Sequence, residues 1–161
     1  MFKELVAANM NIYLDVCCLC RPFDNQTVPR ISIETKAVVA ILSRCSWDWN
    51  LVDSRVLRYE IEKISDDRKR DGIEKMLMIA REYVAYDKKI LGRAEEWENA
   101  GVKGLDSLHL ACAERAGAVF LTTDSRLVKI MMRNEDRYRI PVDNPVSWLM
   151  EVNDDENKNA L

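Results

Sequence analysis

Residues Asn11–Val16 join an apolar run to a single carboxylate, and this limits how the chain can fold. The run is rich in β-branched and aromatic side chains, which predicts a short buried strand. Asp15 lies near its end, and a buried carboxylate is costly unless it is paired or binds a metal. Asp15 is therefore either the cap of the following turn or a metal ligand. The second role would place it at the carboxyl end of a central parallel strand, where open α/β sheets locate their sites.

Strand-like and helix-like segments alternate along the rest of the chain. Further strands are expected at Trp47–Val52, Ala118–Thr122 and Arg139–Val142. Helices are expected at Ile31–Arg44, from Asp53 or Ser54 onward, around Ile73–Ala80, at Lys88–Ala100, Ser107–Ala116 and Ser125–Met132, and from Asn144 onward. This alternation predicts an α/β fold whose parallel sheet is covered by helices on both faces.

The length of 161 residues, 48% of them hydrophobic, suits one domain with a sizeable core. We expect this domain to span residues 1–152, with a helical insert at 66–100, followed by a disordered acidic tail at 153–161. No apolar run approaches the roughly 18 residues needed to cross a bilayer, and no signal pattern opens the chain. A cytoplasmic protein without membrane contact is expected.

The net charge of −3 is not that of a non-specific nucleic-acid binder. A chain of this composition that handles RNA needs a local basic patch or bound cations. The five cysteines, with Cys17, Cys18 and Cys20 together, do not suit a disulfide framework. They also lack the partners of a zinc site, so we expect them to be small buried residues.

Three more acids are associated with apolar segments: Glu60, Asp106 and Asp124. Glu60 shares the apolar stripe of its helix, and is either a site ligand or the partner of an arginine. Asp106 opens a helix, and is either a site ligand or its N-cap. Asp124 follows a buried strand, as Asp15 does. His109, the single histidine, is expected to pack or hydrogen-bond rather than bind metal.

These acids are expected to converge, because right-handed crossovers bring the carboxyl ends of parallel strands to one edge. Three or more neighbouring carboxylates cannot all stay ionised without a cation. Oxygen ligands suit Mg²⁺ or Mn²⁺ rather than zinc.

Five motifs occur in a fixed order between about Asn11 and Leu149. They are Tyr13-Leu14-Asp15, Arg21-Pro22-Phe23-Asp24, Tyr59-Glu60-Ile61, Leu105-Asp106-Ser107-Leu108-His109-Leu110-Ala111 and Leu121-Thr122-Thr123-Asp124. Together they resemble the PIN-domain proteins, which include the ribonuclease toxins of bacterial and archaeal VapBC toxin–antitoxin pairs. The loop at Arg21 and the helical Glu34 resemble one subgroup, in which the role of Glu34 is open. The resemblance implies a three-layer α/β/α sandwich with a central, mainly parallel sheet.

The resemblance also implies a function: a divalent-metal-dependent endoribonuclease that is the toxin of a type II toxin–antitoxin pair. The implied cofactor is Mg²⁺ or Mn²⁺, and hydrolysis would leave a 5′-phosphate and a 3′-hydroxyl. The implied partners are an RNA substrate, a cognate antitoxin and a second copy of the chain.

The implied site residues follow the same motifs. The metal ligands and catalytic acids are Asp15, Glu60, Asp106 and Asp124, and Thr123 is a catalytic hydroxyl that bonds water or phosphate. No metal contact is assigned to Ser125, which stands where relatives often carry a second Asp. The candidate phosphate-binding arginines are Arg21 and Arg126, with Arg30, Arg55 and Arg58 as further candidates.

Other classes fit less of the pattern. A dehalogenase-type phosphotransferase needs Asp-x-Asp after its first strand, and Cys17 occupies the third place here. A response-regulator receiver needs paired acids and a late strand-end lysine, which are not evident. The remaining alternative is a catalytically weak PIN-fold binding or regulatory module. The acidic net charge of the protein favours this alternative. The presence of all four acids, Asp15, Glu60, Asp106 and Asp124, favours an enzyme.

Overall fold

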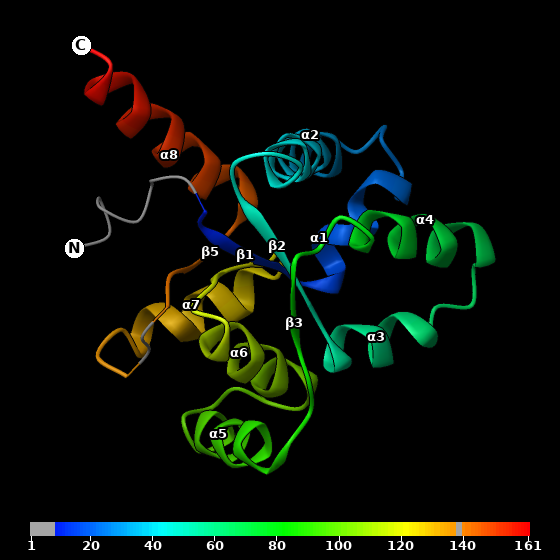
Figure 1. The fold of residues 1–161 in the computed structure, drawn as a ribbon, viewed down its shortest axis with the longest axis vertical. Helices are drawn as coiled ribbons and strands as arrows, with labels where there is room; N and C mark the ends of the chain where they lie inside the picture. The colour runs from blue at the N-terminus through cyan, green and yellow to red at the C-terminus, as the bar shows by residue number, and fades with distance from the viewer. Residues whose placement is uncertain (1–8, 138–139) are drawn as a thin grey trace.

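The structure, a computed structural model, describes residues 9–137 and 140–161. Its strands form one parallel sheet in the order β3-β2-β1-β4-β5 (Figure 1). The strands are β1 (Asn11–Leu14), β2 (Asn50–Ser54), β3 (Glu82–Val84), β4 (Val119–Leu121) and β5 (Val142–Asp143). The helices are α1 (Val16–Cys20), the 3₁₀ helix η2 (Arg21–Phe23), α2 (Pro29–Cys45), α3 (Arg55–Glu62), α4 (Asp67–Leu77), α5 (Lys88–Asn99), α6 (Leu105–Arg115), α7 (Ser125–Arg133) and α8 (Pro145–Asn159).

Helices cover both faces of the sheet, as predicted. Helices α2 and α8 lie on one side, and α5, α6 and α7 lie on the other (Figure 1). Strand β1 is central, and Ile12, Tyr13 and Leu14 are fully buried, as expected for a strand covered on both faces. The three-layer α/β/α sandwich is thus confirmed. Within the described ranges, no helix is both long enough and apolar enough to span a bilayer.

The strand order places a topological switch point between β1 and β4. The chain proceeds outward from β1 through β2 to β3, and then returns to the other side of β1 as β4 and β5. In register, Leu14 pairs with Leu121, so both strands end at the same level. Ligand sites of open α/β sheets lie beyond the carboxyl ends of strands at such a point.

The first two strands differ from the prediction at their ends. Strand β1 stops at Leu14, because the Asp15 carboxylate accepts a hydrogen bond from Val16 N (2.8 Å) and starts α1 there. Strand β2 begins at Asn50, three residues later than predicted. Trp49 precedes it and is fully buried against Trp148 of α8, with ring centroids 5.2 Å apart. The apolar Trp49 before β2 therefore packs against helix α8 and is not part of the strand.

The predicted helical insert at 66–100 contains α4 and α5, and also strand β3 at one edge of the sheet. Two of the three residues of β3 are exposed and Val84 is buried. An edge strand this short has too little alternation to be separated from a loop by pattern alone. At the opposite edge, β5 begins at Val142; Arg139, where a strand was predicted to begin, lies outside the described residues.

The prediction of a disordered tail at 153–161 is wrong, because α8 continues to Asn159. Trp148 and Val152 are buried and lie four residues apart. Glu156 follows on the same face and pairs with Arg44 of α2, at 2.8 Å between Oε1 and Nη1. Packing against α2 therefore extends a helix whose last turns have a polar, disorder-like composition.

Candidate active site

Asp15 lies at the switch point and is 6% exposed. Its backbone N–H donates to Leu121 O (2.9 Å), which joins the ends of β1 and β4. One carboxylate oxygen, Oδ1, caps α1, and the other, Oδ2, accepts from the Thr122 hydroxyl (2.8 Å). Asp15 is therefore a helix cap, and its second oxygen is also held in a fixed direction by a neighbouring strand end.

Glu60 and His109 face each other across α3 and α6. His109 is fully buried, and its Nε2 lies 3.1 Å from Glu60 Oε2. The other ring nitrogen, Nδ1, lies 2.7 Å from the hydroxyl of Tyr13, which in turn lies 2.8 Å from Ser54 Oγ. The expected hydrogen-bonding role of His109 is confirmed, and Glu60 is paired with this histidine rather than with an arginine.

The donors in this series of hydrogen bonds, from Ser54 through Tyr13 and His109 to Glu60, can be assigned from its Glu60 end. The Glu60 carboxylate can only accept, so His109 Nε2 carries the proton of their hydrogen bond. In a neutral imidazole ring Nδ1 then accepts from the Tyr13 hydroxyl, whose pKa burial raises well above its usual value. The Tyr13 oxygen in turn accepts from Ser54 Oγ, which also accepts from Leu57 N (3.0 Å). This series of hydrogen bonds, which begins at Ser54, fixes the direction of the Glu60 carboxylate.

Asp106 is in the first turn of α6 and does not cap this helix, so of its two possible roles the N-cap is excluded. The N-cap is Gly104, whose φ of 60° favours glycine. Burial raises the pKa of Asp106 to about 6, and the negative charges of Asp15, Asp124 and Glu60 act in the same direction. The electrostatic effect of these three carboxylates indicates that the four predicted acids are neighbours.

Asp124 is exposed and caps α7, accepting from the backbone N–H groups of Arg126 (3.0 Å) and Leu127 (3.3 Å). Asp106 and Asp124 line one cavity of about 180 Å³ together with the cationic side chains of Lys103 and Arg126. Lys103 stands in a loop without a motif, so no sequence pattern distinguishes it. Two acids and two cations therefore surround this cavity at the sheet edge.

The donor set fits a hard divalent cation. Ligand atoms of Asp15, Glu60 and His109 all lie within 4.8 Å of one another. Because both nitrogens of His109 are already hydrogen-bonded, the oxygens of Asp15 and Glu60 are the better donors here. Oxygen donors in a crowded acidic cluster match Mg²⁺ or Mn²⁺.

Two of the candidate phosphate-binding arginines, Arg21 and Arg58, form ion pairs within the protein. The Arg21 side chain is one-fifth exposed and pairs with Glu34 (3.1 Å) and Asp24 (3.0 Å). Arg58 similarly binds Asp53, a buried acid at the end of β2 (2.7 Å). Arg126, by contrast, is exposed beside the site acids.

The buried Glu34 connects the segment around Arg21 to the loop that carries Thr123. It is 2% exposed and accepts from Arg21 Nε and Asn144 Nδ2 (2.8 Å), with Arg30 Nε at 3.3 Å. Arg30 in turn donates to the backbone oxygen of Thr123 (2.7 Å). Glu34 thus joins η2, α2 and the start of α8, and through Arg30 it supports the loop that carries Thr123.

The structure distinguishes two adjacent hydroxyls. Thr122, which the resemblance did not assign, donates to Asp15 and accepts from Asp124 N (3.1 Å). Thr123, the assigned residue, is buried, and its backbone N–H lies 3.3 Å from Cys17 Sγ. Residue spacing could not have separated them, because the ends of short strands shift by a residue and adjacent side chains point to opposite faces.

We predict that Asp106→Asn raises the free energy of unfolding by about 1 kcal/mol at pH 8 in EDTA, after allowance for solvent screening of this half-buried group. A carboxyl whose folded-state pKa exceeds its unfolded value destabilises the fold above the folded pKa, here about 6. The gain should therefore shrink as the pH falls from 6 toward 4. Denaturant titrations at pH 8 and pH 4 measure it, and an equal gain at both values would contradict the argument.

Comparison with known proteins finds the fold among solved structures. No family model matches the chain, and no curated protein matches it. A chain of FitAcB from Neisseria gonorrhoeae is 16% identical, with a TM-score of 0.55 over 83% of this chain and 97% of that one. A chain of VapBC2 from Rickettsia felis, bound to a promoter DNA fragment, is 14% identical, with a TM-score of 0.55 over 84% and 98%. A chain of VapBC-1 from nontypeable Haemophilus influenzae is 18% identical, with a TM-score of 0.54 over 84% and 98%. These likenesses establish a common PIN-like fold.

Proposed function

We propose that this protein is a divalent-metal-dependent endoribonuclease and the toxin of a type II toxin–antitoxin pair. One observation carries the proposal: ligand atoms of Asp15, Glu60 and His109 lie within 4.8 Å of one another beyond the carboxyl end of β1, and Asp106 and Asp124 line one cavity. Burial and three neighbouring carboxylates raise the pKa of Asp106, and such crowding of negative charge is relieved by a bound cation. The solved structures of similar fold are toxin–antitoxin complexes, which supports the same assignment.

Asp15 and Glu60 would hold the cation, with Asp106 and Asp124 completing the acidic site. When bound, Mg²⁺ or Mn²⁺ would supply an activated water and charge stabilisation for the phosphodiester. The chain itself orients the ligands: Thr122 directs Asp15, and His109 directs Glu60. Lys103 and Arg126 line the adjoining cavity, where they would offset the charge of the RNA phosphates.

Two partners are part of the proposal. The solved structures of similar fold include toxin–antitoxin pairs, so we propose that a cognate antitoxin binds this chain. We further propose that the chain forms a homodimer. Sedimentation at micromolar concentration tests the dimer, and a monomer under these conditions would rule it out.

The nuclease assignment is tested with purified protein and a panel of structured and single-stranded RNAs, in Mg²⁺, Mn²⁺ or EDTA. We expect cleavage with either metal and none in EDTA. Products should carry a 5′-phosphate, which a phosphate-dependent exonuclease detects. Cleavage that persists in EDTA would contradict the metal-dependent assignment. Failure to cut the panel together with failure to bind Mn²⁺ would favour a binding module.

We predict that Thr122→Val weakens Mn²⁺ binding by about tenfold, because Asp15 loses the hydroxyl that fixes its second oxygen. The substitution keeps the shape of a fully buried side chain. Thr123→Val is the matched control and should change Mn²⁺ affinity by less than about twofold. Isothermal titration with Mn²⁺ compares the two variants. The reverse order of effects would return the role to Thr123, as the resemblance implies.

A further inference from the structure

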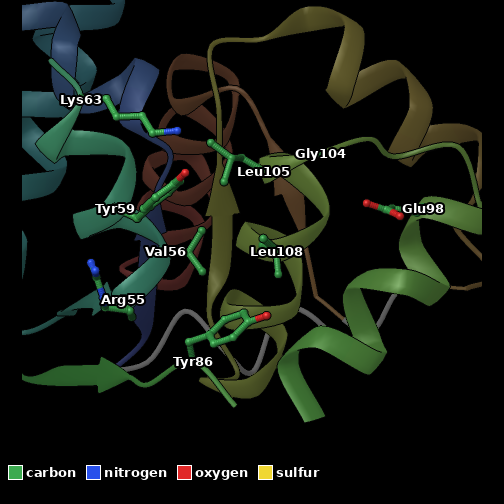
Figure 2. Close-up of a pocket in the computed structure, with 9 residues that line it drawn as sticks. All are labelled: Arg55, Val56, Tyr59, Lys63, Tyr86, Glu98, Gly104, Leu105 and Leu108. Carbon is green, nitrogen blue, oxygen red and sulfur yellow. The ribbon is translucent and has the colours of Figure 1, made fainter. Parts of the chain in front are cut away.

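A groove of about 580 Å³ opens beside the acidic site, and its walls combine aromatic rings with cations (Figure 2). We call it the tyrosine groove. Among the residues that line it are Arg55, Tyr59 and Lys63 on or next to α3, Tyr86 before α5, and Leu105 and Leu108 on α6. Figure 2 shows Lys63 and Leu105 at one end and Tyr86 at the other, with Tyr59 and Leu108 on facing walls.

The two tyrosines offer faces for stacking. Tyr59 is 44% exposed and Tyr86 is 50% exposed, so about half of the surface of each residue is accessible to a ligand. The ammonium of Lys63 lies 4.0 Å from the centroid of the Tyr59 ring, so a cation covers one face of this ring and a base would stack on the other. Arg55 adds a second, half-exposed cation from α3, and this cation also forms a loose surface pair with Glu62 (3.4 Å).

The charge and chemistry of the groove favour one kind of occupant. Two cations and one anion, Glu98, line it, although the chain as a whole carries a net charge of −3. Exposed aromatic rings beside cations are the usual surface for single-stranded nucleic acid, whose unpaired bases can stack while its phosphates are neutralised. A duplex keeps its bases stacked on each other and cannot use the rings in this way.

The groove also continues from the acidic site along two helices. Tyr59 precedes Glu60, and Leu105 precedes Asp106, so each pair of Cα atoms is separated by about 3.8 Å. On α6, Leu105 and Leu108 face the groove, while Asp106 and His109 belong to the site. A strand in the groove would therefore lead directly to the acids.

We propose that the tyrosine groove binds single-stranded RNA beside the cleaved phosphodiester, with bases stacked on Tyr59 and Tyr86. The inference rests on the proposed nuclease function and specifies its substrate as unpaired RNA. It assigns substrate-positioning roles to Tyr59 and Tyr86, to which the resemblance gives no role.

Fluorescence anisotropy tests the proposal with a labelled single-stranded oligoribonucleotide, in EDTA so that metal-dependent cleavage cannot consume the probe. Tyr59→Ala and Tyr86→Ala should each weaken binding by about fivefold or more, and Tyr59→Phe, which keeps the ring, by less than about twofold. Tyr83→Ala is the matched control, because Tyr83 is 57% exposed and is not among the groove residues. It should bind as the wild type does.

The outcomes separate this proposal from the nuclease assignment. Loss of binding in both alanine variants, with the control unchanged, supports the groove even if the wild type does not cleave RNA. Wild-type binding in both variants overturns the groove even if cleavage is metal-dependent. Equal affinity for a duplex of the same sequence also overturns it. A change of Tyr59→Ala from dimer to monomer in sedimentation, with RNA affinity unchanged, would instead make the groove an interface between copies.

Discussion

Asp15→Asn is expected to reduce metal-dependent RNA cleavage by about a thousandfold. The asparagine keeps the size of the side chain and one oxygen that can accept from Val16 N or Thr122 Oγ1, so the fold should persist. It removes one negative charge from a cluster of four acids, and stability in EDTA should stay the same or rise. Initial cleavage rates in Mn²⁺ and thermal melts in EDTA measure the two effects.

Asp53→Asn is the matched control, because Asp53 is also 6% exposed and also lies at the end of a parallel strand. It pairs with Arg58 (2.7 Å) rather than with the site acids. The control should lose stability and keep cleavage, opposite to Asp15→Asn. If Asp15→Asn unfolds the protein, or cuts RNA as fast as the wild type, Asp15 has a structural role and the site assignment is wrong.

Glu34→Ala is expected to lower the free energy of unfolding by about 3 kcal/mol. The carboxylate is 2% exposed and is the shared acceptor of Arg21, Arg30 and Asn144. Its removal leaves the Arg21 guanidinium, which is only one-fifth exposed, with Asp24 as its one remaining ion-pair partner. Urea titration followed by circular dichroism measures the loss.

Glu62→Ala provides the comparison for Glu34→Ala. Glu62 also pairs with an arginine, Arg55, but its side chain is 60% exposed and the atoms are 3.4 Å apart. Exposed pairs of this kind contribute little, so we expect a change below about 0.5 kcal/mol. Similar losses in the two variants would mean that the Glu34 contacts stabilise the fold no more than a surface pair.

The architecture could be predicted because its signals are local. Alternating apolar strands and amphipathic helices define a parallel sheet covered on both faces, and this sheet brings distant strand ends together. The errors occurred where tertiary contacts outweigh local pattern. Arg44 pairs with Glu156, so the polar residues that were predicted to be disordered form the end of α8. Gly104 takes the cap of α6, so Asp106 moved into its first turn.

The candidate site could be predicted only in its acids. Asp15 and Glu60 were identifiable because a carboxylate within an apolar pattern is unusual. A hydrogen-bonding role was expected for His109, but its partners Tyr13 and Glu60 could not be predicted, because they are defined only once α6 is packed against β1. Likewise, Lys103 and Tyr86 belong to no motif, and Tyr59 stands in one only as the neighbour of Glu60. The importance of these three residues depends on which surface they share.

Mn²⁺ binding tests the central claim most directly, because the account requires the acids at the switch point to hold a divalent cation. Crystals grown with MnCl₂ can be examined by anomalous diffraction at the manganese edge. We predict an anomalous peak beside Asp106 that is contacted by carboxylate oxygens of Asp15 and Glu60. This peak should be absent from crystals of Asp15→Asn. A fully loaded crystal with no peak at these acids, or an unchanged peak in the variant, would contradict the account.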